Sequence, residues 1–401
     1  MIRKIVFVFS KYFEKKDWNI FNCPYFLEKG YEIEILSLVQ IHYKGKAKKP
    51  LNIFNDHEVK YFDKIYKFRE EIKKKKRKET LFIVYPSLGE NPGTGYIIRR
   101  IIKQLGFQYC DYFYPPYLLE EYKGRHFPNT WMGIMKYYMK HWENKRDIKN
   151  LLFSIIYPPK LIFITAKENL WMLANKYDTL NKKKLLYINT PDYDEFISKN
   201  SDEDLTILRE EGLEEDKYIV FLDEAFTHHS DITNLGLPGL VTENIYQQEI
   251  AKFFGFVENY TGMKVVIALH PKAEYINSSI FGNRKMIRGK SRILIKYCSL
   301  VIMNCSTALS YVMLYNKKVV VYITEQLKRN QLYRQMTFTE GKYLGCKIVN
   351  ISKKIPDDLF QNYVKSIEKS KREDYIDRFV CSRKQKEKLS AQLIDDCLKK
   401  I

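Results

Sequence analysis

Polar side chains follow one short apolar segment in the second half of the chain. The segment Tyr218 to Leu222 has the composition of a buried strand, and Asp223, Glu224 and Asp231 follow it together with two histidines. Carboxylates and imidazoles this close in sequence can supply a nucleophile, a general acid or a general base. A loop that is merely capped and solvated has the same composition. The two adjacent histidines are compatible with metal binding, but no further Cys or His lies nearby in sequence, and we expect no metal.

The residues after the next apolar segment suit a phosphate. Lys264 to Leu269 is followed by His270, whose imidazole can donate a hydrogen bond to a phosphate oxygen, and then by a proline and Lys272. Farther along, Arg288 and a glycine precede Lys290 and Ser291. A cluster of cations, a glycine and a hydroxyl suits an anion, although the upstream glycine of a Walker motif is missing.

A third apolar segment, Leu300 to Met303, leads into Ser306 and Thr307 and then into the helical pattern Leu309 to Tyr315. Hydroxyl side chains at a helix start can add donors to the free N–H groups of its first turn, which makes a phosphate site. The alternative is that Ser306 and Thr307 only cap the helix.

Strand-like segments alternate with helical patterns in two series, which predicts parallel sheets covered on both faces. The first series is Lys4 to Phe9, Glu32 to Leu36, Leu81 to Tyr85, Leu161 to Thr165 and Leu185 to Asn189. The second is Tyr218 to Leu222, Lys264 to Leu269, Leu300 to Met303, Lys318 to Ile323 and Cys346 to Ile351. Ten strands exceed one typical sheet.

The fold class expected is therefore α/β, with two doubly wound Rossmann-type domains facing a central cleft. The polar stretch Ser198 to Asp216 separates the two series and is a linker or a domain-opening helix. We expect an N-terminal acceptor-binding domain over residues 1–200 and a nucleotide-binding domain over 201–371. A last helix over 372–401 is a candidate to cross back to the first domain. Ligands of such sheets collect outside the carboxyl ends of the strands.

The order of these motifs resembles a known family. Phe221 to Asp231, His270 to Lys272, Gly289 to Ser291 and Ser306 to Ala308 are similar to the bacterial CMP-Kdo-dependent retaining β-Kdo transferases of O-antigen and capsule assembly. Those enzymes have the GT-B fold and are distantly similar to bacterial sialyltransferases. The resemblance covers about Tyr218 to Ile323.

The resemblance implies transfer of Kdo from CMP-Kdo to a surface-polysaccharide acceptor with retention. It implies that Asp231 is the nucleophile of a double displacement. His270, Lys272, Lys290, Ser291, Ser306 and Thr307 would stabilise the leaving phosphate. Asp223 or Glu224 would orient the loop or act as a base. A CMP-sugar carries a single phosphate, so no metal and no cofactor are expected.

Three alternatives remain open. The donor can be another CMP-nonulosonate, such as a sialic, legionaminic or pseudaminic acid. A nucleotide-sugar epimerase of similar architecture would keep the cleft without an acceptor. A nucleic-acid binder would explain the net charge of +20, but no nucleic-acid module accompanies that charge, and we expect no nucleic-acid partner.

The basic charge also suits peripheral contact with the inner membrane, where lipid-linked glycan acceptors reside. Long apolar runs and a secretory signal are lacking, and the seven cysteines are scattered, so we expect a cytoplasmic protein. The densest basic run, Lys73 to Lys78, is typical of a solvated face. Two weaker motifs are Asp192 to Asp194, of the D-x-D form, and the glycine-containing loop Ser87 to Gly95, a candidate for acceptor contact.

Overall fold

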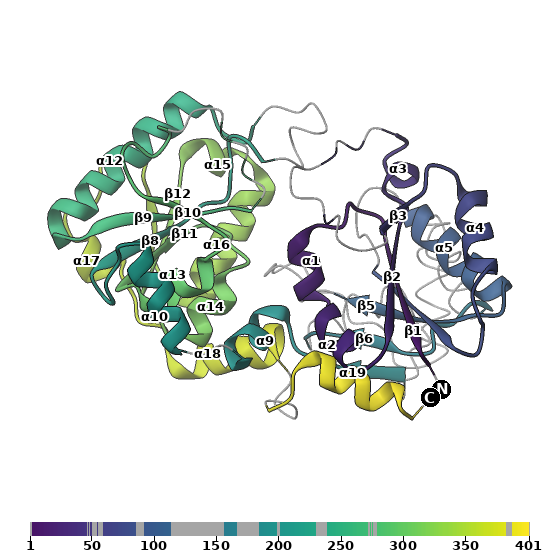
Figure 1. Ribbon diagram of the computed structural model, residues 1–401. Helices are drawn as coiled ribbons and strands as arrows, with labels where there is room; N and C mark the ends of the chain where they lie inside the picture. The colour runs from purple at the N-terminus through teal and green to yellow at the C-terminus, as the bar shows by residue number, and fades with distance from the viewer. Residues whose placement is uncertain are drawn as a thin grey trace, which may run out of the picture. The chain divides into compact units, whose positions relative to one another are not determined.

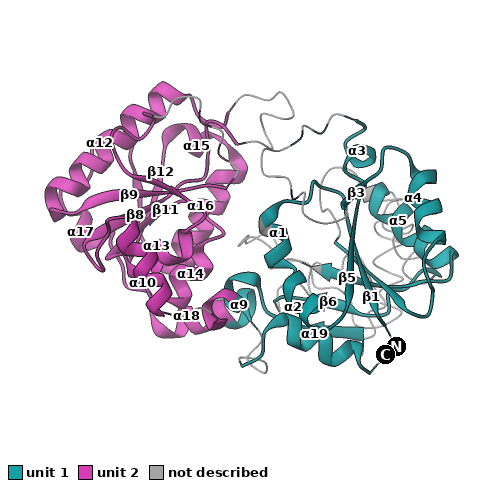
Figure 2. Ribbon diagram, viewed as in Figure 1, with its two compact units in different colours: residues 1–116, 123–194, 377–401 teal, residues 117–122, 195–376 magenta. Residues whose placement is uncertain are grey.

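The computed structural model describes residues 2–45, 47, 49, 54, 59–85, 92–113, 156–166, 184–198, 201–229, 239–271, 273, 275, 279–381 and 387–400. The chain forms two compact units, one of residues 1–116, 123–194 and 377–401 and the other of residues 117–122 and 195–376 (Figure 2). The sequence places the boundary between about Asn189 and Lys217, and these units divide between residues 194 and 195. No described helix is both long and apolar enough to cross a membrane.

Unit 1 contains a parallel sheet of seven strands in the order β3-β2-β1-β4-β5-β6-β7 (Figure 1). The strands are β1 (Lys4–Phe9), β2 (Glu32–Ser37), β3 (Val59–Tyr61), β4 (Thr80–Val84), β5 (Gln108–Phe113), β6 (Ile162–Ile164) and β7 (Leu185–Tyr187). The helices are α1 (Lys15–Ile20), α2 (Cys23–Glu28), α3 (Val39–His42), α4 (Ile65–Lys73), α5 (Pro92–Gln104) and α19 (Ser390–Leu398), and α9 (Pro191–Ser198) runs across the division between the units.

Strand β1 shows why this sheet is covered on both faces. Ile5, Phe7 and Phe9 belong to one buried cluster, and the alternate residues Val6 and Val8 belong to another. Because successive side chains of a strand point to opposite faces, an uninterrupted apolar strand needs helices on both sides. The first cluster includes residues of α2 and α19, and the second includes residues of α4 and α5.

Unit 2 contains a parallel sheet of six strands in the order β10-β9-β8-β11-β12-β13. The strands are β8 (Tyr218–Leu222), β9 (Lys264–Leu269), β10 (Met286–Arg288), β11 (Leu300–Met303), β12 (Val319–Ile323) and β13 (Ile348–Asn350). The helices are α10 (Ser201–Glu210), α12 (Glu243–Thr261), α13 (Ser291–Tyr297), α14 (Leu309–Leu314), α15 (Glu325–Arg329), α16 (Gln331–Leu344), α17 (Leu359–Asn362) and α18 (Lys369–Tyr375), which a π-helix over Ile376–Val380 continues.

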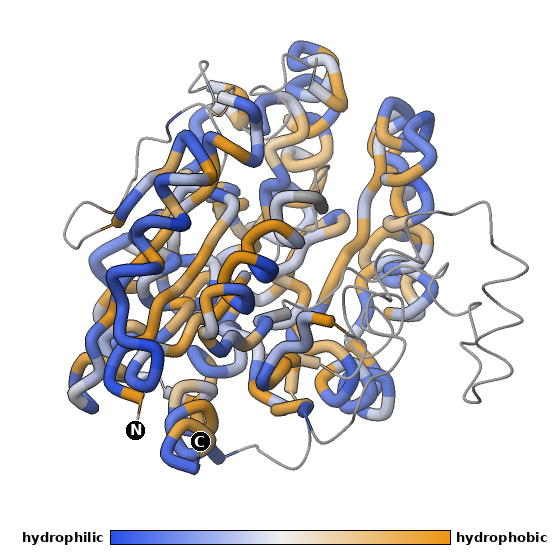
Figure 3. Tube along the Cα trace, turned by 90° about the vertical axis from the view of Figure 1, so that its right-hand side faces the viewer, coloured by the Kyte–Doolittle hydropathy of each residue, from blue (hydrophilic) through white to orange (hydrophobic). Residues whose placement is uncertain are grey.

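The hydrophobic residues follow this layering. In Figure 3 the extended segments are mostly orange, whereas the helices alternate between orange and blue along their turns. In unit 2 the long helix α12 places Tyr246, Ile250, Phe253 and Val257 in the buried cluster. Their spacing of three and four residues is that of one helix face, so this face rests on the sheet.

Each unit is thus a doubly wound α/β domain, as the alternation of strands and helices predicted. The ten expected strands are present, most of them within one or two residues of the expected ends. Three further strands, β3, β5 and β10, were missed. Strands β3 and β10 have three residues each, and β5 has the sequence QYCDYF, in which Gln108 and Asp111 interrupt the apolar pattern.

The expected single helix over residues 372–401 is wrong. Helix α18 ends at Tyr375, the π-helical turn follows, and α19 begins only at Ser390. The amphipathic pattern continues over this stretch, but residues 377–401 belong to unit 1, so the chain changes units after Ile376. A straight helix cannot supply buried faces to two different cores.

The basic run at the end of α4 is largely paired with carboxylates. Lys75 is buried, and its Nζ lies 2.5 Å from Glu34. Lys73, Lys74 and Lys76 lie within 4 Å of glutamates, at 2.6, 3.1 and 3.7 Å. These contacts favour the interpretation of the run as a solvated, ion-paired face.

Candidate functional site

The centre of the unit 2 sheet brings three of the singled-out segments to one edge. Strand β8 pairs with β9 on one side and with β11 on the other, so the strand order reverses there. Because all three strands are parallel, residues 223–229, 270–271 and 304–307 follow them at the same edge. A reversal of strand order opens a crevice at the carboxyl ends, which is where ligands of such sheets bind.

Asp223 connects the ends of β8 and β9. Asp223 is 3% exposed, and its carboxylate accepts hydrogen bonds from the main-chain N–H groups of Ala225 at 2.9 Å and His270 at 3.1 Å. The hydroxyl of Tyr275 donates a third hydrogen bond at 2.5 Å. Burial raises the pKa of Asp223, and these hydrogen bonds partly offset that rise. Asp223 therefore joins the segment after β8 to the turn after β9 that carries His270.

Glu224 lies beside Ser306 at the end of β11. The Ser306 hydroxyl hydrogen-bonds to the Glu224 carboxyl. Although part of the Glu224 residue is accessible, its carboxyl has buried surroundings, and this burial raises its pKa well above the ordinary value. The Ser306 hydrogen bond lowers the pKa, while the carboxyls of Asp223 and Glu340 raise it further. A carboxyl of this kind can hold a proton near neutral pH and give it to a leaving group.

Glu340 is a further buried carboxyl at this edge. It projects from α16, is 4% exposed, and accepts a hydrogen bond from the main-chain N–H of Cys305 at 3.0 Å. Burial raises the pKa of Glu340 to about 7, and the Cys305 N–H limits that rise. Cys305 has a φ of 51°, in the left-handed region that L-residues rarely adopt, so the loop after β11 needs such support.

Helix α16 also holds Asn304, the residue before Cys305 in the loop after β11. The side-chain amide of Asn304 donates to the Tyr322 carbonyl and, at 3.2 Å, to the hydroxyl of Thr337. The Thr337 hydroxyl in turn donates to the Tyr333 carbonyl at 2.7 Å. Helix α16 thus fixes residues 304 and 305, and through them the position of Ser306.

His270 is held by its backbone. The Arg288 guanidinium donates to the carbonyls of His270 and Pro271, both at 2.9 Å, and to the Ala273 carbonyl at 3.0 Å. The imidazole of His270 lies beside that of His229, with ring centroids 4.8 Å apart. Arg288 therefore clamps the turn after β9, and two histidines from neighbouring loops meet at the sheet edge.

The remaining phosphate candidates differ in how they are placed. Lys290 is the N-cap residue of α13, its Nζ lies 2.7 Å from Glu211, and Ser291 is the first residue of that helix. Helix α14 has Ala308 as its N-cap residue, without a side-chain cap, so neither Ser306 nor Thr307 occupies the cap position that was the alternative to phosphate binding. Ser306 instead accepts a hydrogen bond from the Ala308 N–H at 3.2 Å, and Thr307 is exposed.

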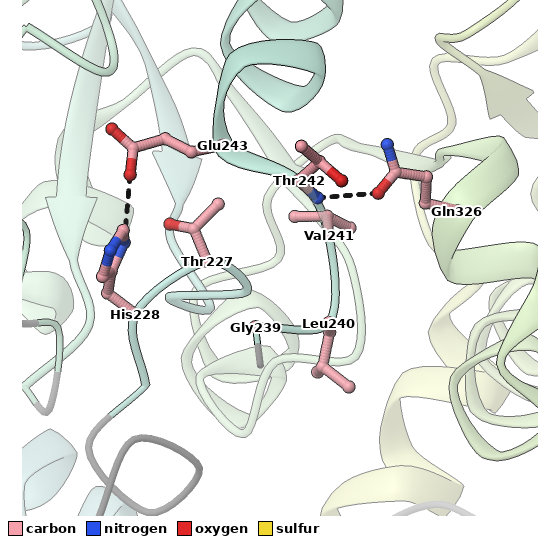
Figure 4. A pocket seen from close by; sticks show the side chains of 8 residues that line it. All are labelled: Thr227, His228, Gly239, Leu240, Val241, Thr242, Glu243 and Gln326. Atoms are coloured by element: carbon pink, nitrogen blue, oxygen red, sulfur yellow. Dashed lines mark hydrogen bonds and ion pairs between the residues drawn. The ribbon is translucent and has the colours of Figure 1, made fainter. Parts of the chain in front are cut away.

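A cavity of about 330 Å³ lies next to these loops, between the segment after β8, the start of α12 and α15 (Figure 4). It is lined by Thr227, His228, Gly239, Leu240, Val241, Thr242, Glu243 and Gln326. His228 Nδ1 lies 3.4 Å from Glu243 Oε2, and the Thr242 N–H donates to Gln326 Oε1 at 2.7 Å.

Gly239 sets the shape of this cavity. A Cβ at this position would lie 2.4 Å from the Thr227 carbonyl oxygen, closer than non-bonded atoms approach. The neighbouring Leu240 N–H donates to the Phe226 carbonyl at 2.8 Å. The segment therefore folds closely over residues 226 and 227, which any side chain at position 239 would prevent.

Two of the expected site residues, Asp231 and Lys272, lie outside the described residues, as do residues 87–91 of the Ser87 to Gly95 loop. The D-x-D motif lies at the start of α9, where the Asp194 carboxylate accepts hydrogen bonds from the Asn189 side chain at 2.9 Å and the Ser390 N–H at 3.1 Å. This aspartate holds α19 within unit 1. Among the described residues, no group of three His, Cys, Asp or Glu side chains is arranged to hold a metal ion.

Sequence reasoning missed Tyr275, Glu243 and Glu340, and treated Arg288 only as part of a basic cluster. Glu340 lies in the middle of a helix that carries many polar residues, so periodicity alone does not mark it as buried. Glu243 opens α12, where an acidic residue is expected in any helix. The pairing of these groups with the motif residues becomes visible only when the strand order is known.

Comparisons with known proteins find a likeness of structure more than of sequence. No protein-family model matches the chain. An uncharacterized protein of Haemophilus influenzae is 30% identical over 159 residues, which are 38% of this chain and 47% of that protein. The match thus spans about half of the length of this relative.

Solved structures of the wall teichoic acid polymerase TagF share the arrangement of the chain. A TagF variant has a TM-score of 0.56 at 13% identity, and the same variant with CDPG has 0.54 at 14%, each covering 99% of this chain and 88% of TagF. Anabaena HepE in complex with UDP and glucose has a TM-score of 0.48 at 11% identity over both full chains. At these identities the TagF likeness concerns the fold, and the two Rossmann-type units have the GT-B fold.

Proposed function

We propose that this chain transfers Kdo from CMP-Kdo to a surface-polysaccharide acceptor, with retention of the β configuration. The observation that carries the proposal is the convergence of Glu224, His270 and Ser306 at the reversal point of the unit 2 sheet. These residues belong to the motifs that resemble β-Kdo transferases. The GT-B fold is compatible with a nucleotide-sugar donor and a glycan acceptor.

The roles proposed for these residues follow from their surroundings. His270 and Ser306 present an imidazole and a hydroxyl to the leaving phosphate of CMP, with Lys272, Lys290, Ser291 and Thr307 as further candidates. Hydrogen-bond donors placed in advance stabilise charge that develops in the transition state. Glu224, whose pKa is raised by burial, is suited to carry a proton. Asp231 is the proposed nucleophile, and a covalent glycosyl ester would divide one substitution into two easier steps.

A thermal-shift comparison of nucleotides tests the donor class. A ligand that binds the folded state raises its melting temperature, so CMP should stabilise the protein more than UDP or GDP at equal concentration. Stronger protection by UDP or GDP would contradict the assignment.

A second experiment tests Asp231. Replacing Asp231 by Asn removes the charge while keeping the shape, and should abolish transfer from CMP-Kdo while CMP still protects the fold. Mass spectrometry of the wild-type protein with CMP-Kdo alone should show one added sugar on the peptide that contains Asp231. The matched control Asp63→Asn alters an exposed carboxylate of unit 1 and should transfer normally. An adduct on Asp223 or Glu224 would refute this role.

A related donor is the second candidate. One of the TagF structures holds CDPG, and a donor of that kind is the alternative to CMP-Kdo. Comparing CMP with CDP in the same thermal-shift assay separates the two, since a diphosphate site should prefer CDP. CMP-activated sialic, legionaminic and pseudaminic acids would be tested as donors in parallel.

The acceptor and the cellular setting complete the proposal. A lipid-linked glycan at the cytoplasmic face of the inner membrane would suit a protein with a net charge of +20, because that surface is anionic. Sedimentation with vesicles that contain anionic lipid should then deplete the protein from solution, and neutral vesicles should not.

A further inference from the structure

The cavity at the start of α12 contains a pair of side chains that none of the roles above uses. His228 Nδ1 and Glu243 Oε2 are 3.4 Å apart, and the two side chains are 23% and 27% exposed (Figure 4). Both line the cavity, so they can meet a ligand as well as each other. His228 Nδ1 is buried and makes no hydrogen bond among the described residues, so Glu243 acts on the ring as a nearby negative charge, which stabilises the imidazole when it takes up a proton.

The other polar groups of the cavity suit a hydroxyl-bearing ligand. Thr227 is 6% exposed, and its hydroxyl has no hydrogen-bond partner among the described residues. Gln326 uses its carbonyl oxygen to accept from Thr242, which leaves an amide N–H₂ group on the cavity wall. Buried polar groups usually have partners, so an unpaired hydroxyl at a cavity indicates a polar ligand or water.

The charge of the cavity argues against a phosphate there. Glu243 contributes a carboxylate at the N-terminal end of α12, where it offsets the positive end of the helix dipole. An anion would meet this carboxylate at close range, whereas the hydroxyl of a sugar or polyol can donate to it. The volume of about 330 Å³ is at the lower end of small-molecule sites.

The cavity adjoins the candidates for the leaving phosphate. His228 is followed directly by His229, whose ring centroid lies 4.8 Å from that of His270. In a double displacement the acceptor attacks the sugar from the face that the leaving phosphate has vacated. A base carried by the loop that meets His270 suits this step.

We propose that the cavity is an acceptor subsite and that His228, with the charge of Glu243 beside it, is the base that takes the proton of the attacking hydroxyl. The proposal rests on the proposed function. In the second displacement the acceptor oxygen forms a bond to the anomeric carbon of the sugar held on Asp231. The bond from that carbon to the Asp231 oxygen breaks, and its electron pair returns to the carboxylate. The acceptor proton passes to His228, which later releases it to solvent.

The test separates the two displacements by their products. In His228→Ala, mixing with CMP-Kdo should release a burst of one CMP per enzyme, because the first displacement does not need this base. Steady release of CMP, with water or added glycerol as acceptor, should fall by about a hundredfold or more. The variant His228→Gln, which keeps the size of the side chain, should behave in the same way.

Azide provides a readout that a structural role would not give. The azide ion carries no proton to be removed, so it should restore steady CMP release in His228→Ala and yield a glycosyl azide detectable by mass spectrometry. In the wild-type protein azide should change the rate little. Normal turnover of His228→Ala, or lack of rescue by azide with the burst intact, would overturn the proposal.

Glu243 is expected to act only through His228. Glu243→Gln keeps a polar group near the imidazole without its charge, and should reduce steady release about tenfold or more while leaving the CMP burst and the protection by CMP unchanged. Azide should again restore turnover. The matched control Glu249→Gln, on the same helix α12, should leave every measurement unchanged.

The outcomes distinguish this proposal from the function on which it rests. If the wild-type protein neither releases CMP nor gains stability from CMP, the proposed function fails and the acceptor subsite fails with it. If the wild-type protein turns over but His228→Ala and His228→Gln lose both the burst and the protection by CMP, His228 serves the donor site instead. That result would overturn the base assignment and leave the transferase function standing.

Discussion

Asp111 in unit 1 and Glu340 in unit 2 are both buried carboxyls next to a parallel sheet, but the two units hold them differently. Asp111 is fully buried, and the Nε and Nη2 atoms of Arg99 each lie 2.8 Å from its Oδ1. Glu340 is 4% exposed, and its recorded partner is the main-chain N–H of Cys305. In one unit the buried charge meets an opposite charge, and in the other it meets only a dipole.

The kind of partner affects how readily a buried carboxyl holds a proton. Desolvation drives a buried carboxyl toward its neutral form unless an opposite charge lies beside it. Burial accordingly raises the pKa of Glu340 to about 7 and raises that of its neighbour Glu224 well above the ordinary value. Burial thus favours the neutral form of both carboxyls at the sheet edge of unit 2, and carboxyls with raised pKa values are typical of functional sites.

The largest effect is expected from Asp111→Ala, which would leave the guanidinium of Arg99 buried without its counterion. Breaking a buried pair in this way typically costs about 3–5 kcal/mol. Urea unfolding of the variant should show a loss of this size. The double variant Arg99→Met with Asp111→Leu removes both charges and should recover most of it. An unchanged midpoint for Asp111→Ala would show that this pair contributes little to the stability of unit 1.

Glu340→Gln should increase the free energy of unfolding, and the size of this increase should depend on pH. The amide oxygen can still accept from the Cys305 N–H, but there is no longer a charge to desolvate. The folded pKa of about 7 lies above the ordinary value of 4.5, so ionisation destabilises the wild-type protein as the pH rises through this window. The variant should therefore match the wild type below about pH 4.5 and exceed it by about 3 kcal/mol above pH 7.

Thermal unfolding of both proteins across this pH range measures that difference directly. Glu258→Gln serves as a control, because Glu258 is paired with Arg284 in the same unit and its removal should destabilise the protein near neutral pH. A Glu340→Gln protein that is less stable than the wild type at pH 8 would show that the carboxylate is needed to hold the loop after β11.

Much of the fold was predictable because apolar segments report burial directly. Strand β1 is apolar from Ile5 to Phe9, and such a run between polar segments indicates a strand covered on both faces. Strand β5 was missed because Asp111 interrupts its pattern, and only the partner Arg99, on a helix, explains how that position is buried. The break between α18 and α19 was missed because both stretches are amphipathic, whatever unit they pack against.

The site was predictable to the extent that it consists of residues immediately after strands. His270 and Ser306 were selected because parallel strands bring such positions to one edge. Glu340 and Tyr275 reach the same edge from a helix and from a later loop, at distances in sequence that no local pattern encodes. Arg288 was recognised as a cation, but its pairing with three carbonyls depends on the course of the turn after β9.

A moderate effect is expected from Thr337→Val, which tests the attachment of the β11 loop to α16. Valine keeps the shape but lacks the hydroxyl that accepts from Asn304 and donates to the Tyr333 carbonyl. The Asn304 amide retains the Tyr322 carbonyl, so the cost should be about 1–2 kcal/mol in urea unfolding. The control Thr206→Val alters an exposed threonine of α10 and should change stability less. Equal losses in the two variants would mean that Thr337 has no special role in this loop.

Arg288→Lys should have the smallest effect on the free energy of unfolding. Its main effect should be faster opening of the turn after β9. The guanidinium reaches three carbonyls of the turn after β9, and an ammonium on a flexible stem cannot span them in the same way. Because Arg288 is exposed, the loss in unfolding free energy should be about 1 kcal/mol or less. Hydrogen exchange should nevertheless become faster at the Ala273 N–H, which donates to the His270 carbonyl at 3.0 Å.

The control Arg284→Lys disturbs the pair with Glu258 on α12 and should leave exchange in this turn unchanged. If Arg288→Lys also leaves it unchanged, the Asp223 carboxylate alone suffices to hold His270 in place.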